Sequence, residues 1–299
     1  MLESSKIANI SCGQDGAIYN GLLFRFDGRG SCRVHKLDDL KSSAGEIAQV
    51  YASFTLDRAD EITPHSNAVC FGRERFDESD EFPLLYTNIY NNYDGKGGDE
   101  LWGVCAVDRL TRKGTDFSST LVQLIEIGFS HDSELWTSHT TGRDKRPFGN
   151  FLVDSASDSY YAFVMRDVPH KTRFFRFDLP SLRDGEYDPT YKVKKVRLER
   201  SDIIELFDVD YSNFLQGACV YDGCIYSVEG GTRNEKNPAA LKVIDLNSKE
   251  IVASVRLGDY GMDIEPEFID HYRGECYYSD CEGNLFILNI SLNKRALSQ

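Results

Sequence analysis

The sequence has no long apolar run and no surplus of positive charge. Its apolar stretches are far shorter than the roughly 20 residues with which a helix crosses a bilayer. Thirty-four lysines and arginines stand against 48 aspartates and glutamates, which gives a formal net charge of −14. An acidic surface repels phosphate backbones and anionic lipids. We therefore expect neither nucleic acid nor a membrane surface as a partner.

An apolar signal core is also absent, because residues 1–6 read MLESSK. This favours a cytoplasmic protein. The eight cysteines lie mostly in apolar, strand-like contexts such as Ala218-Cys219-Val220, which predicts reduced core thiols. No two of them have the close spacing of a zinc site.

Motifs that would identify a common enzyme are missing as well. The chain has no phosphate loop, no dinucleotide fingerprint, no zinc-binding helix motif and no nucleophile elbow. The sequence therefore identifies no cofactor, and its function has to be inferred from the fold and from the polar residues that the fold brings together.

Helical periodicity is almost absent, and apolar residues instead recur with period two in short runs between turns. Leu22, Phe24 and Phe26 alternate in this way. Aromatic residues, which suit pleated surfaces, are plentiful, with 18 Phe and 16 Tyr. The pattern predicts an all-β protein, with helix only in short connections such as Asp202–Phe207.

An internal repeat indicates the architecture. One strand type ends in an apolar residue followed by Asp or Asn. Its copies are Leu37-Asp38, Val107-Asp108, Phe177-Asp178, Ile244-Asp245 and Leu288-Asn289. Two strand-like runs precede each copy and another follows most of them, so that each unit is a four-stranded sheet. Repeats of this kind predict a five-bladed β-propeller.

One domain then spans the chain, with blades at about 12–57, 65–129, 147–199, 214–258 and 264–291. The third blade takes Val193–Leu198 as its outer strand. The last unit has one strand too few, and we expect residues 6–10 to complete it and close the ring. A β-sandwich is the alternative, but it does not explain why the last unit lacks a strand while the N-terminus has one to spare.

Four short segments resemble a group of five-bladed propeller proteins of gut bacteria whose function is unknown. These segments are Gln216–Tyr226, Phe82–Tyr86, His65–Ala68 and Cys105–Asp108. The resemblance spans most of the chain. The Gln-Gly pair that starts a blade at Gln216 is more loosely similar to the bacterial glutaminyl cyclases, which are also five-bladed. The resemblance implies the propeller fold and assigns no activity.

In a propeller, the innermost strand of each blade lines a central channel, and loops at one end of the channel usually build the site. The residues that enter these strands are polar in all five units. They are Gln14-Asp15, His65-Ser66-Asn67, Gly149-Asn150, Gln216-Gly217 and Glu265-Pro266-Glu267. We predict that the ligand-binding residues are Gln14, His65, Asn67, Asn150, Gln216 and Glu267. The alternative for Gln14, Asn150 and Gln216 is that they satisfy backbone groups of the loops.

The candidates for catalysis are Asp15, His65, Glu265 and Glu267. His65 is the only histidine expected at the channel mouth, where it suits a general base, a ligand or a hydrogen-bonded structural role. Glu265 and Glu267 lie two apart on a strand and should face the same side. Two like charges facing one channel raise a carboxyl pKa or attract a cation such as calcium.

Two classes of function fit this pattern. The first is a non-catalytic module that binds a small polar molecule or a peptide at the rim of the ring. The second is an enzyme that uses channel carboxylates. It would be a hydrolase or glycosidase with Asp15, Glu265, Glu267 and Asp154 as candidates, or a cyclase with Glu265 or Glu267 as acid and base. The Asp-Pro blade starts that we associate with propeller glycosidases are absent, which favours the binding module.

Overall fold

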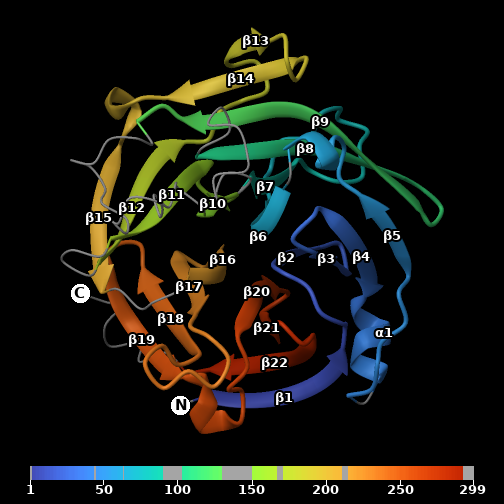
Figure 1. The fold of residues 1–299 in the computed structure, drawn as a ribbon, viewed down its shortest axis with the longest axis vertical. Coiled ribbons are helices and arrows are strands. Elements are labelled where there is room, and N and C mark those ends of the chain that lie inside the picture. Colours follow the sequence, from blue (N-terminus) through green and yellow to red (C-terminus); the bar gives the residue numbers. More distant parts are fainter. Residues whose placement is uncertain are drawn as a thin grey trace.

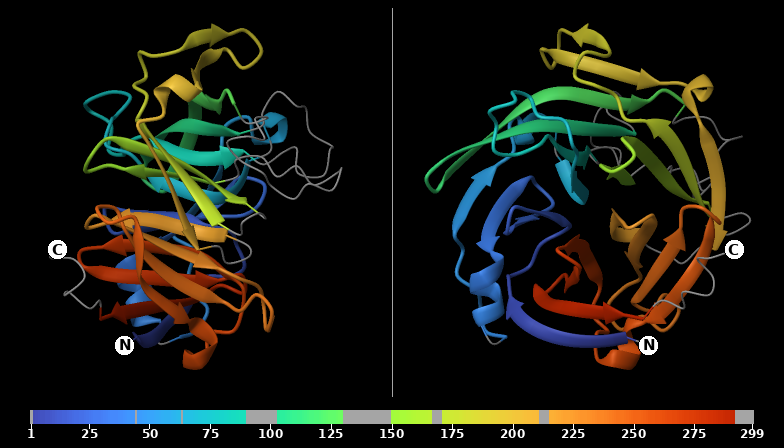
Figure 2. Two further views of the ribbon diagram at one scale, coloured as in Figure 1. Left: turned by 90° about the vertical axis from the view of Figure 1, so that its left-hand side faces the viewer. Right: turned by 180° about the vertical axis from the view of Figure 1, so that it is seen from behind.

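The strands form five small sheets around one axis, so the chain is a five-bladed β-propeller, as the repeat predicted (Figure 1). The computed structural model describes residues 2–43, 45–62, 64–89, 103–129, 150–166, 171–210 and 215–291. Two short helices lie in this described part, α1 (Leu37–Ser42) and α2 (Ala59–Ile62). Figure 2 shows the same ring from the side and from behind.

The first blade shows how the alternating pattern builds a sheet. Its strands are β2 (Gly16–Tyr19), β3 (Leu22–Phe26), β4 (Ser31–Lys36) and β5 (Ala52–Thr55), and each is antiparallel to the next. The β2–β3 turn holds Asn20 and Gly21 at positive φ, as tight hairpin turns require. Leu37-Asp38, predicted as the end of a strand, instead begins α1.

The other blades repeat this order of strands from the axis outward. Blade 2 contains β6 (Pro64–Phe71), β7 (Leu85–Ile89), β8 (Val104–Lys113) and β9 (Asp116–Ile127). Blade 3 contains β10 (Asn150–Asp154), β11 (Ser159–Arg166), β12 (Lys171–Asp178) and β15 (Glu205–Asp210). Blade 4 contains β16 (Leu215–Tyr221), β17 (Cys224–Glu229), β18 (Ala240–Asp245) and β19 (Glu250–Arg256). Residues 147–149, with which the third blade was predicted to begin, lie outside the described residues.

The two ends of the chain share the last blade. Blade 5 contains β20 (Pro266–Tyr272), β21 (Glu275–Asp280), β22 (Asn284–Ile290) and, outermost, β1 (Leu2–Asn9). β1 runs antiparallel to β22, with Leu2 opposite Ile290 and Asn9 opposite Asn284. The prediction that the N-terminal segment completes the last blade is confirmed, and the strand begins earlier than the expected residues 6–10.

The outer part of blade 3 differs from the prediction. Val193–Leu198 forms β14, which does not belong to blade 3 but lies parallel to β9 of blade 2, with Val196 opposite Ile125. β13 (Glu186–Asp188) pairs with β14, so that blade 2 has six strands. The outer strand of blade 3 is β15, where a short helix was expected. Phe207 and Val209 are buried there at period-two spacing, which is the spacing of a strand.

An apolar cluster lies between each pair of neighbouring blades, and these clusters hold the ring together. Between blades 1 and 2 the cluster is rich in aromatic rings, among them Phe24, Phe82 and Phe117. Between blades 5 and 1, Ala8 of β1 packs with Leu23 and Phe268. The N-terminal strand therefore contributes to the core as well as to the last sheet.

Most of the cysteines are part of these cores. All eight carry free thiols, and five of them are buried. Within the described ranges, no helix is long and apolar enough to cross a membrane.

Candidate functional site

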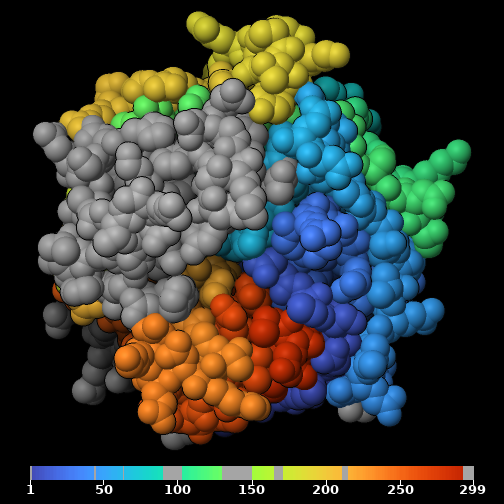
Figure 3. All heavy atoms as spheres, in the orientation of Figure 1, coloured from blue at the N-terminus to red at the C-terminus, as the bar shows by residue number. Residues whose placement is uncertain are grey.

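The polar residues that precede or begin the innermost strands meet at one end of the ring axis. We call this place the mouth and define it by Gln14, Asp15, His65, Asn150, Gln216, Glu265 and Glu267. Blades 5 and 1, which supply Glu267 and Gln14, lie side by side where the red and blue residues meet in Figure 3. The predicted convergence of the strand starts is therefore what the geometry shows, whereas a role in binding or catalysis stays a prediction.

On one side of the mouth, a hydrogen-bonded chain crosses three blades. The Asn150 amide donates to the Gln216 carbonyl oxygen (3.3 Å), and the Gln216 side-chain amide donates to Glu265 Oε1 (2.6 Å). Burial raises the pKa of Glu265, and the bond from Gln216 partly offsets this. Asn150 thus serves the backbone of the next blade, the alternative role considered for it, whereas Gln216 holds a carboxyl group in place.

On the other side, blades 5, 1 and 2 meet. Gln14 Nε2 donates to Glu267 Oε1 across a long distance of 3.5 Å. Gly28 lies next to both Gln14 and His65, because a side chain on Gly28 would come within 3.6 Å of the imidazole ring and 3.9 Å of Gln14 Cγ. Burial lowers the pKa of His65, so that its ring is neutral at pH 7.

Asp15 lies deeper and joins blade 1 to blade 2. Its Oδ2 accepts from the Val69 backbone N–H (3.0 Å), and its own N–H donates to the Ser66 carbonyl (3.0 Å). Burial raises the pKa of this carboxyl group well above its ordinary value. Gly217 of blade 4 faces it so closely that a Cβ there would lie 2.9 Å from Asp15 Oδ1 and 2.5 Å from the Glu267 carbonyl oxygen. Only glycine fits at this point.

Arg25, which was not among the predicted site residues, lies beneath the mouth on β3. Its side chain is 2% exposed, and Nη2 donates to the carbonyl oxygens of Gly13 (2.9 Å) and Asp280 (3.2 Å). Glu267, Asp15 and Asp280 act on it electrostatically, in this order of strength. The signal was present in the sequence, because Arg25 is the one charged residue of the buried strand Leu22–Phe26.

Several polar atoms of this cluster have no hydrogen-bond partner in the part of the chain that the structure describes. They are Arg25 Nε and Nη1, Asp15 Oδ1 and Glu267 Oε2. The three side chains are 2%, 0% and 4% exposed, in that order. Among the described residues no carboxylate comes within 4.0 Å of the Arg25 nitrogens. Buried donors and acceptors of this kind normally have partners, so the cluster holds unused hydrogen-bonding capacity.

Burial is the main cause of the raised pKa of Glu267, which reaches about 8. Arg25 lowers this pKa, while Glu265 and Asp280 raise it further. The expectation that Glu265 would raise the pKa of its neighbour is met, but as a smaller effect than burial. The two carboxyl groups also turn to different partners, since Glu265 binds Gln216 of blade 4 and Glu267 faces Gln14 of blade 1.

Two predicted residues lie away from this cluster. Asn67 accepts a hydrogen bond from Asn88 inside blade 2, so its amide oxygen is already used within the blade. Asp154 ends β10 and holds a turn, where it accepts from the Ala156 N–H (3.0 Å) and the Ser157 hydroxyl (2.5 Å). Across the described ranges, no three His, Cys, Asp or Glu side chains are grouped so that they could hold a metal ion.

Comparison with known proteins supports the fold. No protein-family model and no curated protein matches the chain in sequence. Among solved structures, the glutaminyl cyclase of Myxococcus xanthus is similar, with a TM-score of 0.50 and 11% identity over 97% of this chain and 95% of that one. A glucose dehydrogenase is similar as well, with a TM-score of 0.50 and 12% identity over 97% of this chain and all (100%) of the other. At such identity the likeness concerns the fold alone, and it places the chain among the β-propellers.

Proposed function

We propose that the protein binds a small, neutral polar molecule rich in hydroxyl groups at the mouth. The observation that carries this proposal is the set of unsatisfied atoms on Arg25, Asp15 and Glu267. A guanidinium group only donates hydrogen bonds, whereas a carboxyl group accepts them on its oxygens and, when protonated, also donates one. A hydroxyl group accepts from the one and donates to the other, so neighbouring hydroxyls of one molecule can serve both.

The charge of the cluster favours a neutral ligand. Arg25 remains charged at all ordinary pH values, and one nearby carboxylate is enough to balance it. Burial raises the pKa of Asp15 and Glu267, which favours the neutral form of the remaining carboxyl group. A charged ligand would have to leave water without a counter-charge, at a cost of several kcal/mol. A neutral polyol avoids that cost.

The partly exposed residues of the mouth give such a ligand a first contact. Gln14 and Gln216 are both half-buried. The 3.5 Å contact between Gln14 and Glu267 is at the outer limit of a hydrogen bond, so the Gln14 amide is free to turn toward a ligand hydroxyl. Glu265 is already fixed by Gln216 and offers a second, oriented acceptor.

The test is a binding screen with matched probes. We expect glucose or myo-inositol to raise the melting temperature, and glucosamine (ammonium) and glucuronate (carboxylate) to do so less. For the neutral probe that binds, Glu267→Leu should lower the affinity roughly tenfold, the usual cost of a lost buried hydrogen bond, and Gln14→Ala should lower it less. Glu250→Ala, an exposed change on blade 4, is the control. Preference for a charged probe, or equal affinity of Glu267→Leu, would contradict the proposal.

Acid–base catalysis at the same mouth is a second candidate. The observation that favours it is the pKa of Glu267, which lies at about 8, so that the group is a neutral acid at pH 7 and can donate a proton. A glycosidase also needs a second carboxyl group at a set distance, for which Glu265 and Asp15 are the candidates. A cyclase would use Glu267 or Glu265 as acid and base.

This second candidate has its own assay. The protein is incubated with aryl glycosides and with a peptide that has an N-terminal glutamine, and release of phenol or ammonia is measured. Turnover that Glu267→Gln abolishes would establish catalysis. Neutral-probe binding without any turnover would leave the binding function standing and remove the enzymatic one.

A further inference from the structure

The β13–β14 hairpin forms a firmly held extension on the outside of blade 2. Asp188 Oδ1 accepts from the backbone N–H groups of Thr190 (2.8 Å) and Tyr191 (3.2 Å), which fixes the turn of the hairpin. Arg58, in the connection between blades 1 and 2, donates to the carbonyl oxygens of the same two residues and lies over the Tyr191 ring at 5.3 Å. The extension is therefore held both by β9 and by this connection, and any site on it is preformed.

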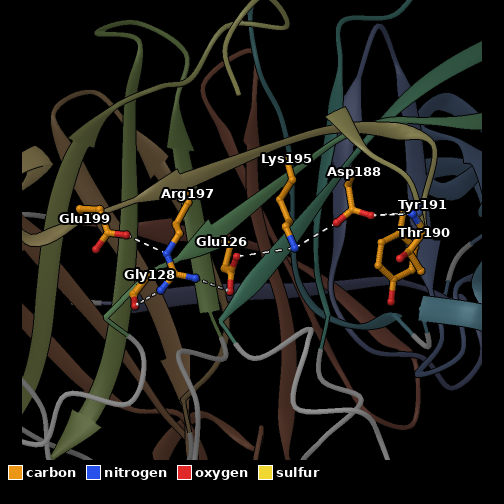
Figure 4. Close-up of polar contacts among 8 residues, drawn as sticks. All are labelled: Glu126, Gly128, Asp188, Thr190, Tyr191, Lys195, Arg197 and Glu199. Carbon is orange, nitrogen blue, oxygen red and sulfur yellow. Dashed lines mark hydrogen bonds and ion pairs between the residues drawn. The ribbon is translucent and has the colours of Figure 1, made fainter. Parts of the chain in front are cut away.

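A row of alternating charges runs along this extension (Figure 4). Lys195 lies between Asp188 (3.0 Å) and Glu126 (3.8 Å). Arg197 lies between Glu126 (3.3 Å) and Glu199 (2.7 Å). Both cations of the row are thus already matched by carboxylates. Beside the row is a groove of about 600 Å³, and its lining includes Glu126, Glu186, Tyr187, Asp188, Lys195 and Arg197.

The groove follows an open edge of the sheet. β13 covers only Val193–Lys195 of β14. The chain that leads into β13 turns away at Gly185, which has a φ of +85° and lies so close to Lys195 that a side chain would come within 2.6 Å of its carbonyl oxygen. Among the described residues, no strand lies beside the remainder of β14 on this side.

The backbone of Arg197 points to that open edge. Gly128 N–H donates to the Leu198 carbonyl (2.7 Å), so Leu198 bonds to the β9 side. In a parallel pair, alternate residues of a strand bond to the same neighbour. The N–H and C=O of Arg197 therefore face away from β9, into the space that a further strand would occupy. Open strand edges are templates for pairing with another chain.

The unmatched charge of the groove is negative. Glu186 is exposed and has no ion pair within the described part of the chain. Tyr187 beside it is 65% exposed and offers a ring on which an aliphatic or cationic side chain can rest. The net charge of −14 attracts basic partners over a distance.

From these observations we infer that the groove binds an extended, basic segment of a partner protein, which adds a strand to blade 2 at Arg197. Its backbone pairs with Arg197, one of its lysine or arginine side chains pairs with Glu186, and another can rest on the Tyr187 ring on the opposite face of β13. This is strand addition, in which the backbone gives affinity and the side chains give specificity. The site is separate from the mouth and does not depend on the function proposed there.

The probe is a fluorescein-labelled heptapeptide of alternating lysine and valine, and its counterpart has glutamate in place of lysine. We expect the basic peptide to bind and the acidic one not to. Glu186→Lys should weaken binding of the basic peptide roughly five- to tenfold, since an exposed attraction becomes a repulsion. The double variant Glu186→Lys/Tyr187→Ala should bind the peptide more weakly still. Glu250→Lys, which makes the same charge change on blade 4, is the matched control.

The backbone contact has its own readout. Basic peptide should protect the Arg197 amide from hydrogen exchange, and a peptide N-methylated on alternate residues should lose this protection. Three results would each overturn the inference: no binding of the basic peptide at millimolar concentration, equal weakening by Glu186→Lys and Glu250→Lys, or binding that leaves the Arg197 amide unprotected.

Discussion

Arg25 is a buried cation that donates to two backbone carbonyls, and three carboxyl groups act on it electrostatically. Replacing it by methionine keeps the volume but leaves those acceptors without their donor. We expect Arg25→Met to lower the free energy of unfolding by about 3–5 kcal/mol, as removal of one partner of a buried charge network usually does. Urea denaturation measures this. The double variant Arg25→Met/Glu267→Gln should lose less free energy of unfolding than the sum of the losses of the two single variants. A loss below about 1 kcal/mol for Arg25→Met alone would show that Arg25 is dispensable.

Glu267 makes stability depend on pH. The pKa of the folded protein is about 8, against an ordinary value of 4.5. Between these pH values the folded state keeps a proton that the unfolded chain releases, so stability falls as the pH rises through this window. Because glutamine cannot ionise, the stability of Glu267→Gln relative to the wild type should increase as the pH rises. Urea midpoints at about pH 4, 6.5 and 9 test this, with the exposed change Glu250→Gln as control. A constant difference across these pH values would show that the pKa is not raised.

Gly217 of blade 4 lies against the backbone of Glu267 and the side chain of Asp15 at the mouth. A methyl group there would meet the Glu267 carbonyl oxygen at 2.5 Å and Asp15 Oδ1 at 2.9 Å. We expect Gly217→Ala to cost about 1–3 kcal/mol, the range for overpacking, because backbone has to move. Gly258→Ala, whose new methyl group would find its nearest atom at 3.7 Å, is the matched control. Equal melting temperatures of the two variants would contradict the close approach.

At this scale, the sequence revealed only part of the mouth. Gln216 and Glu265 were found because polar residues at the start of an inner strand stand out against the apolar repeat. Arg25 was not, since it comes to the mouth from the second strand of its blade, and only the pairing of β3 with β2 brings it there. A charged residue in a strand whose other members are all apolar is the signal that could have identified it.

Among the structural elements, β1 carries the closure of the ring. Among the described strands it alone pairs with the outer side of β22, and Ala8 on it is fully buried against Leu23 and Phe268. Deleting residues 1–9 should therefore expose an apolar edge and abolish a single cooperative thermal transition. A synthetic peptide of residues 1–11 should restore it, whereas the same peptide with Ala8→Asp should not. An unchanged transition in the shortened protein would mean that β1 is not needed for closure.

The elements that the sequence placed correctly are those in which local pattern and sheet agree. Period-two alternation identified β3 and the blade that contains it. Val193–Leu198 was recognised as a strand but given to the wrong blade, because its parallel pairing with β9 follows from the path of the chain and not from its own residues. At β15, the segment Asp202–Phe207 was expected as a short helical connection, but pairing with β12 imposes the extended form from Glu205 onward.

For the whole molecule, the net charge of −14 is the main electrostatic property. Like charges distributed over a ring repel one another, and salt screens this repulsion over about 10 Å at 0.1 M. We expect the melting temperature at pH 7 to rise by a few degrees when NaCl is increased from about 50 to 500 mM. Sucrose at the same osmolality is the control, because it is excluded from the protein surface but does not screen charges. A fall of the melting temperature with added salt would show that ion pairs such as Lys242–Glu229 (2.9 Å) outweigh the repulsion.

The sharing of blade 5 by both ends of the chain also sets the order of events during synthesis. β1 precedes every other described strand in the chain and its partner β22 follows them, so β1 has to wait until the blades between them have been made. Contacts between residues this far apart in sequence slow folding, and until they form the nascent chain exposes an unpaired edge. Ring closure is therefore a late step in the folding of this domain, and a chaperone that shields β1 or β20–β21 would act during that interval.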